Sequence, residues 1–186
     1  MKQTTRNDTV AHQKLAEHLV AEGLRAPIVT RIARVPKSVV AHYYLKHYNK
    51  ASPSGQMPSN PLWHVDGYAE STHSALIVLV YLRVLEELKQ KFPHSTREDL
   101  AAHAFARTLD FYNDTICGGD TPLVSPERVH SLTQHFADKS AFARTGSSQI
   151  KLPQCSVCRT PMMVKSHYTQ FTCEHCIKLK GARKPH

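Results

Sequence analysis

Four cysteines near the C-terminus, Cys155, Cys158, Cys173 and Cys176, form two Cys-x-x-Cys pairs separated by 14 residues. This spacing is typical of a structural zinc site, because each short turn can direct two thiolates at one ion and two such turns complete a tetrahedron of sulfurs. Four sulfur ligands leave no open position for water, so the metal is expected to stabilise the fold and to carry out no chemistry. We therefore predict one structural Zn²⁺ per chain. The alternative is four unpaired or disulfide-linked cysteines.

Other residues near the cysteines are weaker candidates for chemistry. His167 or His175 could replace a thiolate, although a histidine between the two sulfurs of one Cys-x-x-Cys would project away from the metal. The fifth cysteine, Cys117, has no partner in the sequence and is interpreted as a small, half-buried residue. A zinc deaminase would need a His-x-Glu motif, and none of the 13 histidines is followed two residues later by glutamate. No phosphate-binding loop or Gly-x-Ser-x-Gly motif is present, so we expect no enzyme activity.

The stretch from Pro27 to Tyr48 has the pattern of a helix-turn-helix. Its apolar residues are spaced to pack two short helices across a tight bend, and its basic residues remain outside. In such a motif the second helix enters a major groove and nearby cations hold phosphates. The alternative is an ordinary helical hairpin with a solvated basic face. The candidate DNA contacts here are Arg31, Arg34, Lys37, His42, Lys46 and Lys50.

A second group of cations flanks the cysteines. A compact scaffold fixed by zinc can present such charges to phosphates without ordering a loop on binding. The alternative is a solvated face that keeps the protein soluble. The candidate contacts in this group are Arg159, Lys165, Lys178 and Lys180.

Composition agrees with a polyanionic partner. The net charge is +9 and the pI is near 9.4, which favours nucleic acid first and an anionic surface second. The longest apolar run, Ala75 to Leu82, is far shorter than the roughly 20 residues that a membrane span needs. The first 15 residues contain no apolar segment of a signal peptide. We therefore expect a cytoplasmic protein with reduced thiols and no membrane association.

The fold that positions these residues is predicted to be mainly α-helical. A small zinc-ribbon-like module, in which four cysteines bind the metal, is predicted at the C-terminal end. We predict a helical domain over residues 1–144, a zinc-binding module over 145–177 and a basic flexible tail over 178–186. Six helices are expected. The first runs from Thr9 or Asp8 to Gly23, and the next three cover residues 27–34, 37–48 and 66–92. The fifth runs from a capping box at 95–98 to Gly118, and the sixth from Ser125 to about Phe142. Residues 50–62 and 145–153 read as connectors.

The order of these features resembles one known family. The block from Arg25 to Trp63, with Tyr44, Gly55 and Pro58, is followed by a helical middle and the paired cysteines. This order resembles FlhC, the zinc-containing subunit of the bacterial flagellar master transcriptional activator. Two departures are a slightly shorter insert between the cysteine pairs and Arg159, where zinc knuckles often have glycine.

The resemblance implies a transcriptional activator subunit that joins FlhD-like subunits in a hetero-oligomer and binds double-stranded promoter DNA upstream of flagellar operons. It also implies that the four paired cysteines are the zinc ligands, and it makes RNA polymerase a candidate further partner. Two alternatives stay open. The chain could be a zinc-ribbon adaptor for protein interactions, or a FlhC-like regulator of non-flagellar promoters.

Overall fold

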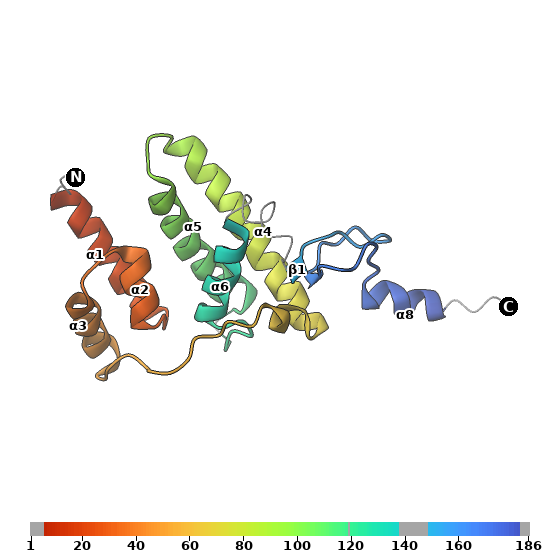
Figure 1. Cartoon of the computed structure of the whole chain (residues 1–186), viewed down its shortest axis with the longest axis horizontal. Coiled ribbons are helices and arrows are strands. Elements are labelled where there is room, and N and C mark those ends of the chain that lie inside the picture. The colour runs from red at the N-terminus through yellow and green to blue at the C-terminus, as the bar shows by residue number, and fades with distance from the viewer. Residues whose placement is uncertain (1–5, 119, 138–148, 183–186) are drawn as a thin grey trace.

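The computed structural model describes residues 6–118, 120–137 and 149–182 of the 186-residue chain. Its described part is mainly helical, with seven α-helices and one two-stranded sheet. Figure 1 shows the elements spread along one long axis: α1 to α3 lie at one end, α4 to α6 in the middle, and the sheet with α8 at the other end. The predicted fold class, helical with a small four-cysteine region at the C-terminal end, is confirmed.

The N-terminal end is a unit of three helices, α1 (Arg6–Ala21), α2 (Ala26–Ala33) and α3 (Lys37–Tyr48). Each of these helices packs on the other two. α1 ends before Gly23, whose φ of +82° is a left-handed conformation that glycine adopts readily.

The middle unit begins after an extended connector that runs from α3 to a short 3₁₀ helix (Figure 1). α4 is the longest helix, and both α5 and α6 pack on it. The elements of this unit are η1 (Pro61–Val65), α4 (Tyr68–Lys91), α5 (Arg97–Phe111), the π-helical turn η2 (Tyr112–Ile116) and α6 (Pro126–Ala137).

The C-terminal end is an antiparallel ribbon followed by a helix. β1 (Ile150–Lys151) pairs with β2 (Val164–Lys165), and an isolated bridge between Gln154 and Pro161 extends the ribbon toward its tip. α8 (Glu174–Ala182) follows the second cysteine pair.

One contiguous hydrophobic core joins these parts. Residues of α1 to α3, of α4 to α6 and of the ribbon belong to the same cluster, and Ile150 and Met163 are the members from the ribbon. A second, smaller cluster surrounds three of the cysteines and includes Met162. Met162 and Met163 are adjacent in an extended segment, so their side chains point to opposite sides. The ribbon therefore connects the cysteine cluster to the main core.

Several predicted boundaries are wrong. α1 begins by Arg6, ahead of the predicted caps. The cap of α5 is Thr96, whose hydroxyl accepts a hydrogen bond from the backbone N–H of Asp99 at 3.2 Å, so the capping box lies one residue later than predicted. Ile150 is fully buried in a strand rather than part of a linker.

α8 continues from the cysteines to Ala182, so residues 178–182 of the predicted flexible tail are helical, and the rest of that tail lies outside the described residues. The predicted end of the last middle helix near Phe142 lies outside the described residues. Of the helices that the structure describes, none is both long and apolar enough to cross a membrane.

Candidate metal centre and nucleic-acid interface

The four paired cysteines meet at one point of the structure. Their sulfurs all lie within 4.8 Å of one another, and the Cys158 and Cys173 sulfurs are 3.8 Å apart. Four sulfurs around Zn²⁺ at about 2.3 Å are separated by about 3.8 Å, so the spacing fits a tetrahedral ion. A disulfide bond would need sulfurs about 2.05 Å apart, and all five cysteines are free.

The first cysteine pair is held by a tight turn at the tip of the ribbon. The backbone N–H of Cys155 donates to the carbonyl of Thr160 at 2.9 Å, and the N–H of Arg159 donates back to the carbonyl of Cys155 at 3.0 Å. Arg159 has a φ of +63°, the left-handed conformation that favours glycine. The expected glycine geometry is therefore present with an arginine in it, at a conformational strain of roughly 1 kcal/mol.

The second pair is held at the start of α8. The carbonyl of Cys173 accepts a hydrogen bond from the N–H of Ile177 at 3.0 Å, which places Cys173 at the helix cap and Cys176 in the first turn. The positive end of a helix dipole stabilises thiolates there. The two turns are also joined to each other, because Ser156 N–H donates to the carbonyl of Phe171 at 2.8 Å and the hydroxyls of Ser156 and Thr172 are 2.9 Å apart.

Hydrogen bonds prepare two of the sulfurs for a cation. The backbone N–H groups of Cys173, at 3.4 Å, and of Val157, at 3.5 Å, point at the Cys155 sulfur. Donors of this kind, that of Cys173 first, lower the pKa of Cys155 to about 6. The hydroxyl of Thr160 lies 3.2 Å from the Cys158 sulfur and lowers the pKa of that thiol as well.

The thiol of Cys176 is harder to ionise than the thiols of the first cysteine pair. Burial, followed by the neighbouring sulfurs, raises the pKa of Cys176 to about 12. A divalent cation at the centre would offset both effects and allow four thiolates to coexist. The donor set is soft, closed and tetrahedral, so it fits Zn²⁺ in a structural role. His175 and His167 are exposed and lie outside this ligand group, and Cys117 is half-buried and apart from it.

The metal centre is anchored to the helical middle through Ser71 of α4. The Ser71 hydroxyl donates to the carbonyl of Met163 at 2.6 Å, and the Met163 N–H lies 3.4 Å from the Ser71 carbonyl. Both residues are buried. Sequence reasoning did not find this anchor, because a serine inside a predicted helix carries no signal of a distant partner.

The second candidate site is the pair α2 and α3, which has helix-turn-helix dimensions. The helices have 8 and 12 residues and are joined by Arg34, Val35 and Pro36. Arg34 takes the left-handed conformation, with φ of +53°, that glycine often supplies in such turns. The Tyr44 hydroxyl donates to the Leu24 carbonyl at 2.7 Å, which fixes α3 against the end of α1.

α3 has one buried and one exposed face. Val40 and Tyr44 are buried against α1 and α2. The opposite face, which we call the α3 face, has polar and small side chains toward the start of the helix and an apolar one further on. It consists of Lys37, Ser38, Ala41, His42 and Leu45, the last of which is 58% exposed.

The structure separates the predicted DNA contacts into two groups. Arg34 forms an ion pair with Asp99 of α5, and Lys46 forms one with Glu17 of α1, which raises the pKa of Lys46. The charges of Arg34 and Lys46 are therefore partly neutralised by carboxylates of the same protein. Within the described residues no carboxylate forms an ion pair with Lys37 or Lys50.

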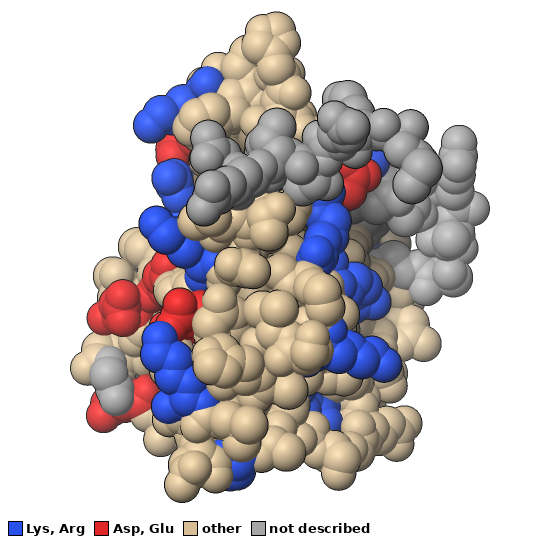
Figure 2. All heavy atoms as spheres, turned by 90° about the vertical axis from the view of Figure 1, so that its left-hand side faces the viewer, with Lys and Arg blue, Asp and Glu red and all other residues tan. Residues whose placement is uncertain are grey.

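The surface around α1 to α3 has a mixed charge distribution. Figure 2 views this end of the molecule and shows Lys and Arg in two bands along its sides, with acidic residues mostly among one of them. The region around the cysteines, residues 149–182, is called the zinc region after the metal that it is predicted to bind. It adds exposed Arg159, Lys165 and Lys178, and the Nζ atom of Lys178 is 3.8 Å from a carboxylate oxygen of Glu174. The side chain of Lys180 lies outside the described set.

The α1–α3 unit meets the middle unit along a line of polar side chains that sequence reasoning did not predict. We call it the seam. It consists of the pairs His18 with Asp110 at 2.7 Å, Glu22 with Asn113 at 2.7 Å, Arg25 with Glu127 at 3.3 Å, Arg31 with His130 at 3.3 Å, His12 with Asp99 at 3.8 Å, and Arg34 with Asp99.

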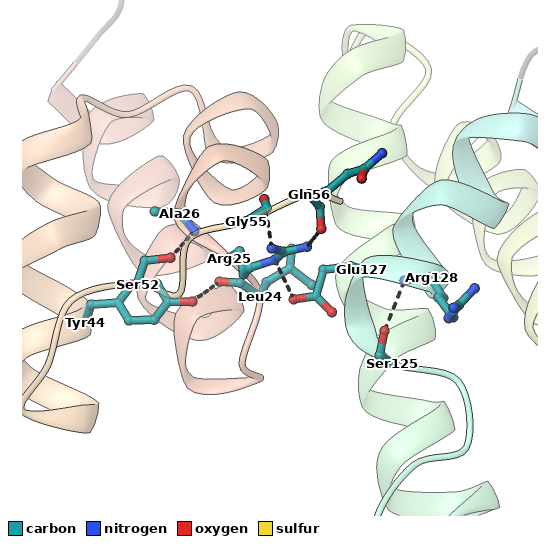
Figure 3. Close-up of polar contacts among 10 residues, drawn as sticks. All are labelled: Leu24, Arg25, Ala26, Tyr44, Ser52, Gly55, Gln56, Ser125, Glu127 and Arg128. Atoms are coloured by element: carbon teal, nitrogen blue, oxygen red, sulfur yellow. Dashed lines mark hydrogen bonds and ion pairs between the residues drawn. The ribbon is translucent and has the colours of Figure 1, made fainter. Parts of the chain in front are cut away.

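Arg25 is the best-buried charge in the seam. Its side chain is 12% exposed and that of Glu127, on α6, is 15% exposed. Its guanidinium also donates to the carbonyls of Gly55 and Gln56, at 3.3 and 3.2 Å, and so holds the connector against α6 (Figure 3). This residue fixes the position of the helix-turn-helix relative to the middle of the molecule.

No known family model matches the chain, and no curated protein matches it either. The resemblance to FlhC therefore stays a prediction.

Proposed function

We propose that this protein is a DNA-binding transcriptional regulator in which zinc holds the C-terminal end of the fold. The observation that carries the proposal is the α2–α3 pair, with its short turn and its exposed α3 face. In helix-turn-helix proteins the N-terminal residues of the second helix reach base edges while flanking cations hold phosphates. Lys37 and His42 occupy such positions here.

The resemblance to FlhC suggests which kind of regulator this protein is. We propose a FlhC-like activator subunit that acts in the cytoplasm, with an FlhD-like partner, on promoters of flagellar operons. The net charge of +9 supports a polyanionic partner. The closed cysteine site supports a structural use of zinc.

A protein adaptor is the second candidate, because the zinc region exposes apolar side chains. Val157, Tyr168, Ile177 and Leu179 are between 48% and 56% exposed. Apolar side chains gathered on one small module are typical of protein-binding surfaces. The adaptor function and the DNA-binding function make opposite predictions for salt dependence.

The two functions are separated by measuring the affinity for a fluorescent promoter duplex over a series of salt concentrations. The zinc-loaded chain is used alone and co-expressed with its FlhD-like partner. If Lys37 contacts a phosphate, affinity falls steeply with salt, and Lys37→Ala lowers the slope of log K against log salt by about 1.

Lys89→Ala is the matched control, since Lys89 is an exposed lysine on α4, away from α3, and its loss changes the net charge equally. This variant should keep the wild-type slope. Binding that does not depend on salt would exclude phosphate contacts and favour the adaptor function.

A further inference from the structure

A cleft lies where the seam reaches the end of α2. It is an open cleft lined by residues of α2, α5 and α6 and has a volume of about 360 Å³. None of the described residues that line it comes from α3, so it is separate from the α3 face. The zinc region contributes none of the lining residues either.

Three guanidinium groups line this cleft, from Arg31 and Arg34 at the end of α2 and from Arg97 at the start of α5. The acidic groups near them are Glu98, which lines the cleft, and Asp99, which pairs with Arg34. Among the described residues no carboxylate forms an ion pair with Arg31, so most of its N–H donors remain available. Of the described charged residues that line the cleft, three are arginines and one is a glutamate.

His130 of α6 orients Arg31. The histidine is 5% exposed, and its Nε2 atom accepts a hydrogen bond from Arg31 at 3.3 Å. Its ring packs edge-on against buried Phe105, with ring centroids 5.6 Å apart. A neutral, buried ring thus accepts from one nitrogen of the guanidinium, and the other nitrogens keep their N–H donors.

The remaining lining is apolar or neutral. Ile32 and Ala101 are half-buried on opposite sides of the cleft, on α2 and α5, and Gln134 contributes an amide from α6. An apolar wall with a few convergent charged groups is the usual composition of a small-molecule site, and the volume is within the range of such sites.

We propose that this cleft binds a phosphorylated anion of nucleotide size, with its phosphates on Arg31 and Arg34 and its apolar part against Ile32 and Ala101. Such a ligand would connect α2 to α5 and α6 across the seam. If α3 binds DNA as proposed above, the ligand would fix the helix-turn-helix relative to the middle unit.

The test is calorimetric titration of the zinc-loaded full chain with pyrophosphate and with ADP, in the absence of DNA. Both probes should bind, and ADP should bind more tightly because it also covers the apolar wall. Arg31→Ala should weaken both at least tenfold, and Arg31→Lys should weaken them less. Arg107→Ala is the matched control, since Arg107 is exposed on α5 outside the cleft, and it should leave both affinities within twofold of wild type.

Three results would overturn the proposal. One is the absence of binding, and another is an equal loss in the Arg31 and Arg107 variants, which would indicate general attraction to a basic protein. The third, in a separate competition titration, is displacement of pyrophosphate by duplex DNA, which would assign the arginines to the DNA surface. Equal affinity for ADP and pyrophosphate would contradict the role of the apolar wall. Because the titration contains no DNA, its failure leaves the DNA-binding proposal unaffected.

Discussion

Two histidines, His64 of η1 and His130 of α6, are buried. The Nδ1 atom of His64 is 2.7 Å from the hydroxyl of Ser74, and the residue is 2% exposed. Burial, followed by the nearby charges of Arg128 and His135, lowers the pKa of His64 to about 4. Burial and Arg31 lower the pKa of His130 to about 4 as well. Both rings are therefore neutral in the folded protein at neutral pH.

This neutrality makes stability depend on pH. An unfolded histidine has a pKa near 6.5, so between about pH 6.5 and pH 4 the unfolded chain binds protons that the folded chain does not. The free energy of unfolding should fall as pH decreases through this window, by about 2 kcal/mol per histidine between pH 7.5 and pH 5. Denaturant unfolding followed by circular dichroism at a series of pH values measures it.

His130→Asn removes one titrating group and keeps an acceptor for Arg31, so its unfolding free energy should depend less steeply on pH than that of the wild type. The exposed His94→Asn is the control and should keep the wild-type dependence. Any loss of zinc at low pH affects all three proteins alike. An unchanged slope in His130→Asn would contradict the assignment of the pH effect to this residue.

At the scale of elements, two clusters stabilise the C-terminal end. Cys155, Cys173 and Cys176 belong to the small cluster that we propose is held by zinc, whereas Ile150 and Met163 belong to the main core. Loss of metal should therefore release the turns and α8 first. β1 and β2 should persist longer, because Ser71 holds Met163 by hydrogen bonds.

Chelation of zinc, or Cys155→Ser with Cys158→Ser, should abolish hydrogen-exchange protection over residues 154–160 and 171–179 and leave β2, α4 and α5 protected. Mass spectrometry of exchanged peptides measures this, alongside zinc content. Cys117→Ser is the control, because this half-buried cysteine is outside the ligand group, and it should change neither quantity. Unchanged protection after zinc removal would show that the metal is not structural.

The sequence predicted what depends on local pattern. The cysteine spacing predicted the four-sulfur cluster, and apolar periodicity with Pro and Gly signals predicted α2, α3 and α4 within two residues. It did not predict the left-handed backbone of Arg34 and Arg159, because glycine is the usual signal for that conformation. The seam was also missed, since pairs such as His18 with Asp110 join residues distant in the sequence.

At the scale of the whole molecule, the candidate DNA surface and the metal centre lie at opposite ends of the long axis (Figure 1). α1 to α3 are joined to the middle by the shared core and by polar pairs such as Arg25 with Glu127. The zinc region is joined to the other side of the middle through Ser71 and Met163. If the α3 face contacts DNA as proposed, the cysteine cluster lies at the far end of the molecule from that contact.

The central claim is that the α3 face contacts DNA, and photo-crosslinking tests it most directly. A benzoylphenylalanine is placed at Ala41 in the α3 face, at Lys165 in the zinc region, or at exposed Gln90 on α4 as the control. Each protein, with its FlhD-like partner, is irradiated on the promoter duplex. We predict a strong crosslink from position 41 and none from position 90. Bound protein with no crosslink from position 41, above all with one from position 165, would contradict the account and move the DNA surface to the zinc region.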